Sequence, residues 1–305
     1  MKKFTVIFLF FVTILSAQYD RPGSTDGQFL KIGVSPRGEA MGGAYISLVK
    51  GAEAAYYNPA ALSEMKGTDI FLSHTRWFAG INHNYISIAK NFGDIGSFAL
   101  SATALRTDEM IVTTPLQPSG NGETFYSSNY RFGLTYSRYF NDHVTIGLTV
   151  SYLYFSLYKD FSASSFSVDI AAKYKADFRD FGFAMQISHF GSDVSYVNES
   201  YPLPTNFIFG ANMNAVEFDT SKLIVAVQAN KPNEGPPKIV GGMEWNYNDK
   251  FFVRGGYQFS HSTARYSFGA GMQYSLSGYD MNLDYSYNDY NLLNVVHRFA
   301  IGIHF

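Results

Sequence analysis

The chain has 305 residues, a formal net charge of −2 and no cysteine, which excludes disulfide frameworks, thiol nucleophiles and cysteine-ligated metals. Aromatic residues make up 17% and charged residues only 16%, proportions that suit the apolar belt and aromatic girdles of a membrane-spanning barrel. The charge is near neutral without basic clusters, so nothing indicates binding to nucleic acid.

Residues 1–17 are predicted to be a cleaved signal peptide. Lys2 and Lys3 precede an apolar run from Phe4 to Leu15, and small residues follow before Gln18. The run is too short to cross a membrane as a helix. An uncleaved N-terminal anchor is the alternative. After this segment, no run of about 18 apolar residues is available for a spanning helix.

Residues 18–67 are predicted to form a compact plug. Glycine and alanine dominate and allow one backbone to approach another closely, while Pro59 interrupts short helical turns. In a barrel of this size the natural place for such a segment is the lumen. A solvated periplasmic tail is the alternative, which the concentration of small and apolar residues disfavours.

Residues 68–305 are predicted to form one transmembrane antiparallel β-barrel. In residues 144–154, apolar side chains alternate with Thr, Gly and Ser, over a length that suits a tilted membrane strand of roughly 9–11 residues. About fourteen strands are expected, an even number as single-chain bacterial barrels have. They cover residues 68–78, 82–91, 95–106, 129–140, 143–158, 163–176, 180–191, 205–216, 221–230, 238–247, 250–260, 265–276, 279–288 and 295–305.

Connection lengths predict the orientation of this barrel. Every second connection is short and rich in Asn, Asp and Gly, as periplasmic turns are. The other set contains the three longest connections, residues 107–128, 192–204 and 231–237, and is therefore assigned to the external face. A soluble β-sandwich has no reason to place its long loops on alternate connections.

The last strand carries a candidate assembly signal for the bacterial outer membrane. Phe299, Ile301, Ile303 and the terminal Phe305 share one face of this strand. An aromatic C-terminal residue on an amphipathic strand looks like the signal read by the barrel assembly machinery. The same strand must also pair with the first one to close the barrel.

Charged residues in the predicted strands are expected to face the lumen, because charge on the lipid face costs roughly 2–4 kcal/mol at the midplane. They could form a polar conduit or anchor the plug, or they could simply pair with one another and be hydrated. The set comprises Arg131, Arg138, Asp169, Lys173, Glu244, Arg254, Arg265, Asp284 and Arg298.

The long loop between residues 106 and 130 is a candidate partner-binding surface, because exposed loops rarely carry so many apolar residues. It could bind an exported protein, or it could fold over the barrel mouth and bury itself. Its apolar residues are Met110, Ile111, Val112, Leu116, Phe125 and Tyr126.

No enzyme is predicted. The sequence contains no nucleophile-elbow, zinc-protease or phosphate-loop motif, and its seven histidines have no recognisable metal-ligand spacing. His189 and Asp193 flank Ser192, a grouping more typical of a solvated loop than of a catalytic site. We therefore expect no catalytic residues, no metal and no cofactor.

The plug segment carries a motif of Arg37, Gly42, Gly43, Asn58, Pro59 and Ala60. This motif resembles the opening of the PorV/PorQ family, and the resemblance covers nearly the whole mature chain. The similarity continues at residues 73–81, in the long loop and at Asp169. Asp169 lies between lipid-facing Val168 and Ile170, so we expect it to tether the plug through backbone N–H groups.

The resemblance implies a fourteen-stranded barrel similar to the FadL fatty-acid transporters, with an N-terminal plug. It also implies an accessory role in type IX protein secretion, in a Bacteroidetes-like host. There, PorV-like proteins bind the C-terminal signal domains of secreted proteins and carry them from the secretion translocon to the attachment machinery. The alternative is a FadL-like outer-membrane transporter of small hydrophobic compounds.

Overall fold

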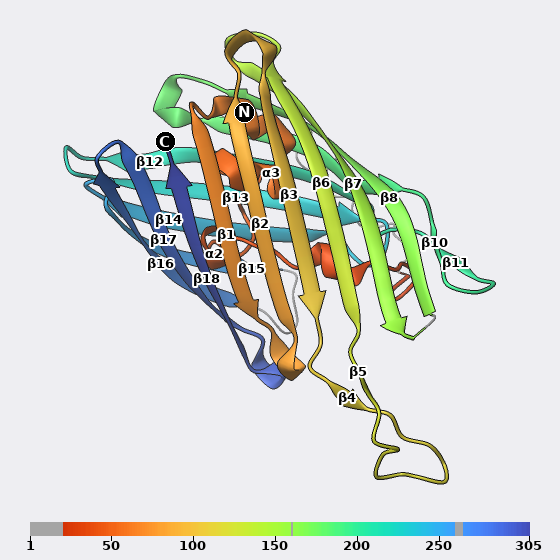
Figure 1. The fold of residues 1–305 in the computed structure, drawn as a ribbon. Coiled ribbons are helices and arrows are strands. Elements are labelled where there is room, and N and C mark those ends of the chain that lie inside the picture. Colours follow the sequence, from red (N-terminus) through yellow and green to blue (C-terminus); the bar gives the residue numbers. More distant parts are fainter. Residues whose placement is uncertain (1–20, 160, 260–264) are drawn as a thin grey trace, which may run out of the picture.

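A computed structural model describes residues 21–159, 161–259 and 265–305, so the predicted signal peptide, residues 1–17, lies outside the described residues. Fourteen strands close into an antiparallel barrel in which β1 pairs with β18 (Figure 1). The predicted fold is confirmed. The barrel strands are β1 (Thr68–Arg76), β2 (Asn82–Asn91), β3 (Ser97–Arg106), β6 (Ser128–Tyr139), β7 (Val144–Tyr158), β8 (Phe161–Lys175), β9 (Gly182–Gly191), β12 (Asn206–Glu217), β13 (Ser221–Pro232), β14 (Lys238–Tyr247), β15 (Phe251–Gln258), β16 (Tyr266–Leu276), β17 (Tyr279–Asp289) and β18 (Val295–His304).

The outer and inner faces of the barrel wall carry different side chains, as the alternation of apolar and small or polar residues in the sequence predicts. In β7, Leu148 and Val150 are exposed on the outside, whereas Thr149 and Ser151 are fully buried on the inside. A continuous outer surface of exposed aliphatic and aromatic side chains is stable only against lipid, and strand pairing satisfies the backbone polar groups. The chain is therefore a transmembrane barrel. In the part of the chain that the structure describes, no helix is long and apolar enough to cross a membrane.

The long connections all leave from one end of the barrel, which we take as the external end. Two of them contain small hairpins that the sequence did not predict. One consists of β4 (Met110–Ile111) and β5 (Thr124–Phe125), and the other of β10 (Val194–Ser195) and β11 (Ser200–Tyr201). Short 3-10 helices lie in four other connections: η4 (Phe78–Gly80), η5 (Gly93–Ile95), η6 (Phe178–Asp180) and η7 (Asn291–Leu293).

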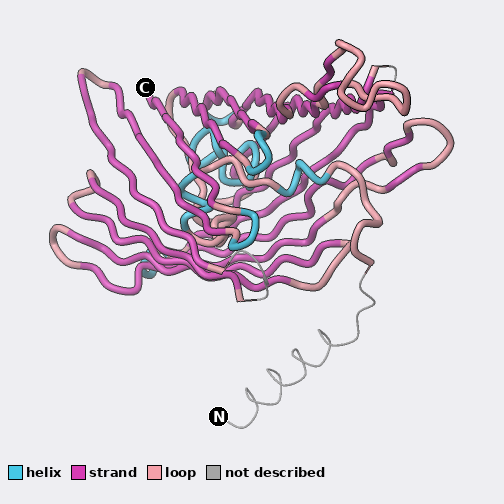
Figure 2. Tube along the Cα trace, turned by 90° about the horizontal axis from the view of Figure 1, so that it is seen from below, coloured by secondary structure: helices cyan, strands magenta, loops and turns pink. Residues whose placement is uncertain are grey.

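The N-terminal segment runs through the lumen (Figure 2). Its side chains, among them Tyr45, Val49 and Leu62, form the main apolar core together with inward residues of the wall such as Tyr85 and Val240. The described part of this plug, residues 21–67, contains five short helices: η1 (Gln28–Lys31), α2 (Pro36–Ala40), η2 (Gly51–Glu53), α3 (Ala54–Tyr57) and η3 (Pro59–Glu64).

Most of the charged residues predicted to face the lumen do so, but Arg138 faces outward, which corrects the prediction for this residue. It shares the pleat of outward Phe132 and Leu134 and is exposed near the periplasmic end of β6. At that height an arginine can reach the polar edge of the membrane, so the cost of facing outward is small. Arg265 is also exposed, because it precedes the first residue of β16.

Candidate functional site

The N-terminal lead, residues 21–31, lies at the external mouth and is held there by Glu234. This carboxylate accepts hydrogen bonds from the backbone N–H of Thr25 (3.1 Å) and the side chain of Gln28 (2.8 Å), and it forms an ion pair with Lys31. Burial alone would raise the pKa of Glu234, but these hydrogen bonds outweigh it and hold the pKa at about 2. The carboxylate is therefore ionised throughout the neutral range.

Further inside, Arg37 of the plug is fixed to the barrel wall. Its Nε and Nη2 atoms donate to the two carboxylate oxygens of Glu244, both at 2.8 Å. Glu244 is fully buried and also pairs with Arg254 of the neighbouring strand, which in turn pairs with Asp284. A planar guanidinium matched to a carboxylate in this way fixes orientation as well as distance.

Three further polar contacts attach the plug at other heights of the wall. Lys173 in β8 pairs with Glu64 at 2.9 Å, and Arg298 in β18 pairs with Glu39 at 3.5 Å. In β13, the amide oxygen of Gln228 accepts the consecutive backbone N–H groups of residues 45 and 46. The lumenal charges thus pair with the plug as well as with one another.

Two close approaches of backbone to backbone complete the packing of the plug. Gly42 has φ +70°, and its amide nitrogen lies only 2.0 Å from the position that a Cβ on Gly256 would occupy. Gly43 follows with φ +90°. At the periplasmic end, a Cβ on Gly147 would lie 2.3 Å from the carbonyl carbon of Pro59. Both wall positions need glycine because the plug touches the strand itself.

The Asn-Pro-Ala part of the predicted plug motif is an internal brace of the plug. The buried Asn58 side chain donates to the carbonyl of Ile46 at 2.8 Å and accepts from the N–H of Ala60 at 3.0 Å. The carbonyl of Ala60 accepts from Ser137 in β6 at 2.9 Å. These bonds fix the turn at Pro59 against the wall.

Among residues 21–67, the described part of the plug, no backbone N–H group binds Asp169, which corrects the predicted direct tether. Its carboxylate pairs with Arg131 in β6 at 2.5 Å and accepts the backbone N–H of His189 in β9 at 2.6 Å. His189 has φ +57°, and the register between β8 and β9 shifts beside Asp169. The carboxylate therefore fills the irregular part of the wall, and it is linked to the plug through Arg131, whose guanidinium lies 5.2 Å from the ring centre of Tyr56.

Replacing Asp169 by alanine is expected to weaken the wall between β8 and β9. Arg131 would remain buried without its partner, a change that typically costs about 3–5 kcal/mol. The denaturant midpoint for unfolding of the detergent-solubilised barrel should fall clearly. Asp193→Ala, in the exposed loop after β9, is the control and should leave the midpoint unchanged. Equal midpoints for the two variants would contradict this role of Asp169.

The loop between β3 and β6 extends away from the barrel mouth (Figure 1). Leu116 is 94% exposed and Ile111 60%. Phe125 packs on Tyr158 with ring centres 4.7 Å apart, and Tyr126 stacks under Arg106. Of the two alternatives for this loop, the one in which it folds over the mouth and buries itself is therefore wrong. The remaining two predicted residues, Met110 and Val112, flank Ile111 along the same arm of the hairpin extension.

Between the plug and the external mouth lies a cavity of about 670 Å³, here called the vestibule. Its floor is formed by plug residues, including Ile32, Tyr56 and Tyr57, and its upper edge by the lead. Trp77, Ile81 and Tyr290 contribute an aromatic and aliphatic wall from the ends of β1, β2 and β17. The size suits a small organic ligand.

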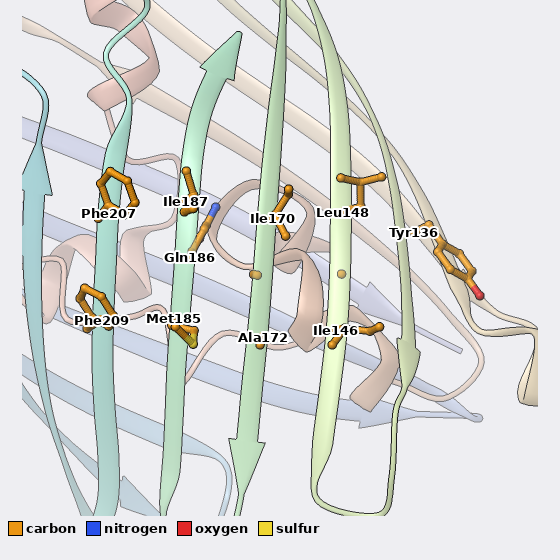
Figure 3. Close-up of a pocket in the computed structure, with 12 residues that line it drawn as sticks. Tyr136, Ile146, Leu148, Ile170, Ala172, Met185, Gln186, Ile187, Phe207 and Phe209 are labelled. Carbon is orange, nitrogen blue, oxygen red and sulfur yellow. The ribbon is translucent and has the colours of Figure 1, made fainter.

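A second concavity of similar volume lies on the outside of the barrel, where outward side chains of β6, β7, β8, β9 and β12 surround a shallow apolar groove (Figure 3). Its lining includes Leu148, Ile170 and Phe207. Because this surface faces lipid, acyl chains are the expected occupant. The groove is therefore part of the membrane-facing surface.

Sequence reasoning missed the vestibule. Its lining comes from the plug, the lead and the external ends of strands far apart in the chain. His189, which the sequence analysis grouped with Ser192 and Asp193 as typical of a solvated loop, lies in β9 and lines the vestibule. No group of three or more histidine, aspartate or glutamate side chains placed to hold a metal occurs among residues 21–159, 161–259 and 265–305.

The final strand presents Phe299, Ile301 and Phe305 outward, and the last carbonyl accepts the N–H of Thr68 at 2.7 Å. Ile303 shares this face and is half-buried. Strand β18 thus closes the barrel against β1. Recognition of these residues by assembly machinery stays a prediction.

Comparison with known proteins identifies the architecture. No protein-family profile and no curated protein sequence matches the chain, but solved structures do. The toluene transporter TbuX of Ralstonia pickettii superimposes with a TM-score of 0.56 at 15% identity, covering 89% of this chain and 97% of that one. The fold is FadL-like. The toluene transporter TodX of Pseudomonas putida gives 0.55 at 12% identity (89% and 97% covered), and a FadL homologue of Pseudomonas aeruginosa gives 0.52 at 12% identity (88% and 97% covered). At these identities the likeness concerns the fold alone.

Proposed function

We propose that this FadL-like barrel takes up small hydrophobic molecules across the outer membrane, with the vestibule as the entry site and the plug as the gate. The observation that carries the proposal is the vestibule itself, a cavity with an aromatic wall that opens outward and ends on the plug. A site for small apolar ligands needs such a concave and partly aromatic lining. TbuX and TodX, which share the fold, are described as toluene transporters.

The proposal is tested by filling the vestibule. Ser188 lies on the inner face of β9 and lines the cavity, whereas Met185 of the same strand faces lipid. In a Gram-negative host that expresses the protein, uptake of the fluorescent hydrophobe N-phenylnaphthylamine should fall several-fold with Ser188→Trp, because the indole occupies the ligand space. Met185→Trp, the matched control, should transport normally.

Uptake that is the same with the Ser188→Trp variant, the unmodified protein and an empty host would overturn the proposal. Surface protease accessibility of the long loop verifies that both variants reach the outer membrane.

A second candidate function is supported by the extension between β3 and β6. Met110, Ile111, Leu116 and Tyr126 are exposed along it, and a group of exposed apolar side chains on a projecting loop suits recognition of another protein. In this function the barrel is an accessory of type IX secretion in a Bacteroidetes-like host and binds secreted proteins that share a C-terminal signal domain. Deleting residues 117–123 should then weaken their recovery with the tagged protein while barrel assembly is unaffected.

A further inference from the structure

The groove on the outside of the barrel, with a volume of about 670 Å³, lies between two rows of outward side chains (Figure 3). Within each row the residues are direct neighbours on adjacent strands from β6 to β12. Ala172 has the shortest side chain of both rows and leaves the space that the groove occupies. The upper row consists of Tyr136, Leu148, Ile170, Ile187 and Phe207, and the lower row of Arg138, Ile146, Ala172, Met185 and Phe209.

The groove is inclined to the membrane plane. Rows of paired residues run perpendicular to strands that are themselves tilted by roughly 35–45°. Tyr136 lies near the periplasmic end of β6, which ends at Tyr139, whereas Phe207 is the second residue of β12 and lies at its external end. The groove therefore starts at the periplasmic edge of the wall and rises into the membrane as it passes from β6 to β12.

The length of the groove matches one leaflet of a bilayer. Five strands at a spacing of about 4.8 Å span about 19 Å, which at this tilt corresponds to about 13 Å of membrane depth. The hydrocarbon part of one leaflet is about 15 Å thick. One acyl chain of a lipid in the periplasmic leaflet therefore fits along the groove.

Two cations without carboxylate partners stand at the periplasmic edge beside the groove. Arg138 is exposed at the lower end of the groove, and Lys90 is exposed on the outer face of β2. Among residues 21–159, 161–259 and 265–305, neither forms an ion pair, although Asp94 and Asp142 lie in the adjacent periplasmic turns. At this depth the two side chains can reach the head groups of the lipids.

The chemistry of these two cations favours one kind of lipid. A guanidinium binds a phosphate through two parallel hydrogen bonds, and a glycerophospholipid carries its phosphate at the polar end of its acyl chains, which is where Arg138 stands. An ethanolamine head group would add an ammonium beside two cations, whereas a glycerol head group adds no positive charge. A lipid with a net negative charge therefore fits better than a zwitterionic one.

We propose that the groove is a binding site for one anionic glycerophospholipid of the periplasmic leaflet. The phosphate binds Arg138, and one acyl chain lies over Ala172 and extends toward Phe209. The site is on the opposite side of the wall from the vestibule, so this inference does not rest on the proposed uptake function.

Native mass spectrometry of the delipidated, detergent-solubilised protein tests the proposal. The probes are dioleoyl phosphatidylglycerol and dioleoyl phosphatidylethanolamine, which share their acyl chains and their phosphate. We expect one phosphatidylglycerol per barrel, bound at a concentration roughly tenfold lower than phosphatidylethanolamine requires, as a charge-assisted contact allows.

Two variants locate the site. Arg138→Gln should bring phosphatidylglycerol to the level of phosphatidylethanolamine, and Arg76→Gln, at an exposed arginine on the external end of β1, is its control and should change nothing. Ala172→Phe fills the groove and should weaken the binding of both lipids several-fold. Ala270→Phe makes the same change at an exposed alanine in β16 and should leave binding unchanged.

Equal binding of the two lipids by the unmodified protein would overturn the proposed preference for an anionic lipid. Binding of many phosphatidylglycerol molecules without saturation at one per barrel would show general contact with lipid and overturn the site. Phosphatidylglycerol binding that is the same with Ala172→Phe and with Ala270→Phe would exclude the groove. The comparison of the two lipids uses the unmodified protein, so it decides the first point even if a variant does not fold.

Discussion

Replacing Glu244 by leucine is expected to release the plug from the barrel wall. The carboxylate is fully buried and binds Arg37 of the plug through two hydrogen bonds of 2.8 Å. Without it Arg37 is left in the lumen with no carboxylate opposite, and breaking such a buried pair typically costs about 3–5 kcal/mol. Trypsin cleavage after Arg37 should become fast, and single-channel conductance in a planar bilayer should rise.

Lys222→Leu is the control for Glu244→Leu. It breaks an ion pair with Asp249 at 3.1 Å that is largely exposed, and such a pair contributes about 0–1 kcal/mol. The plug should stay protected in this variant. The double variant Arg37→Met and Glu244→Met should bring the conductance part of the way back to the unmodified level, because neither charge is then left unpaired. Slow cleavage at Arg37 in Glu244→Leu would show that the pair does not hold the plug.

Valine at position 256 is expected to displace the turn at Gly42 from the wall. A Cβ there would lie 2.0 Å from the amide nitrogen of Gly42 and 2.2 Å from the carbonyl carbon of Met41, and both are backbone atoms that cannot rotate away. Valine itself suits a strand, so the barrel should form while the plug moves. Conductance should rise, and the N-phenylnaphthylamine uptake should increase with it.

The neighbouring glycine is a matched control for Gly256→Val. A Cβ on Gly255 would meet nothing within 4 Å, and this residue occupies the opposite pleat of β15. Gly255→Val makes the same chemical change in the same strand and should leave conductance at the unmodified level. If the two valine variants conduct alike, close packing of the plug against β15 is not what keeps the lumen shut.

The wall was predictable from sequence because each strand sits between lipid and a polar lumen. That contrast imposes a period of two, which is visible in β7 without any knowledge of its neighbours. The predicted direction of a charged side chain was wrong where its position along the strand matters more than the alternation between the two faces. Arg138 points outward near the end of β6, where the membrane becomes more polar. The alternation pattern carries no information about this depth in the membrane.

The site was less predictable because it depends on pairs of segments far apart in the chain. Asp169 is recognisable as an inward carboxylate, but its partners are set by a register shift that only the paired strands β8 and β9 reveal. The plug was recognised from its small residues. Its pairing with Glu244 and its path to the external mouth require the closed barrel around it.

That path has a consequence for biogenesis. The lead lies at the external mouth, while β1 begins at the periplasmic end, so the chain passes once along the whole lumen before the first strand starts. Such a segment is most simply enclosed if it already lies in the lumen when β1 pairs with β18 and closes the barrel. The pairing of β18, the last strand to be synthesised, would then close a lumen that the plug already occupies. The assembling barrel would therefore have no open pore at any stage.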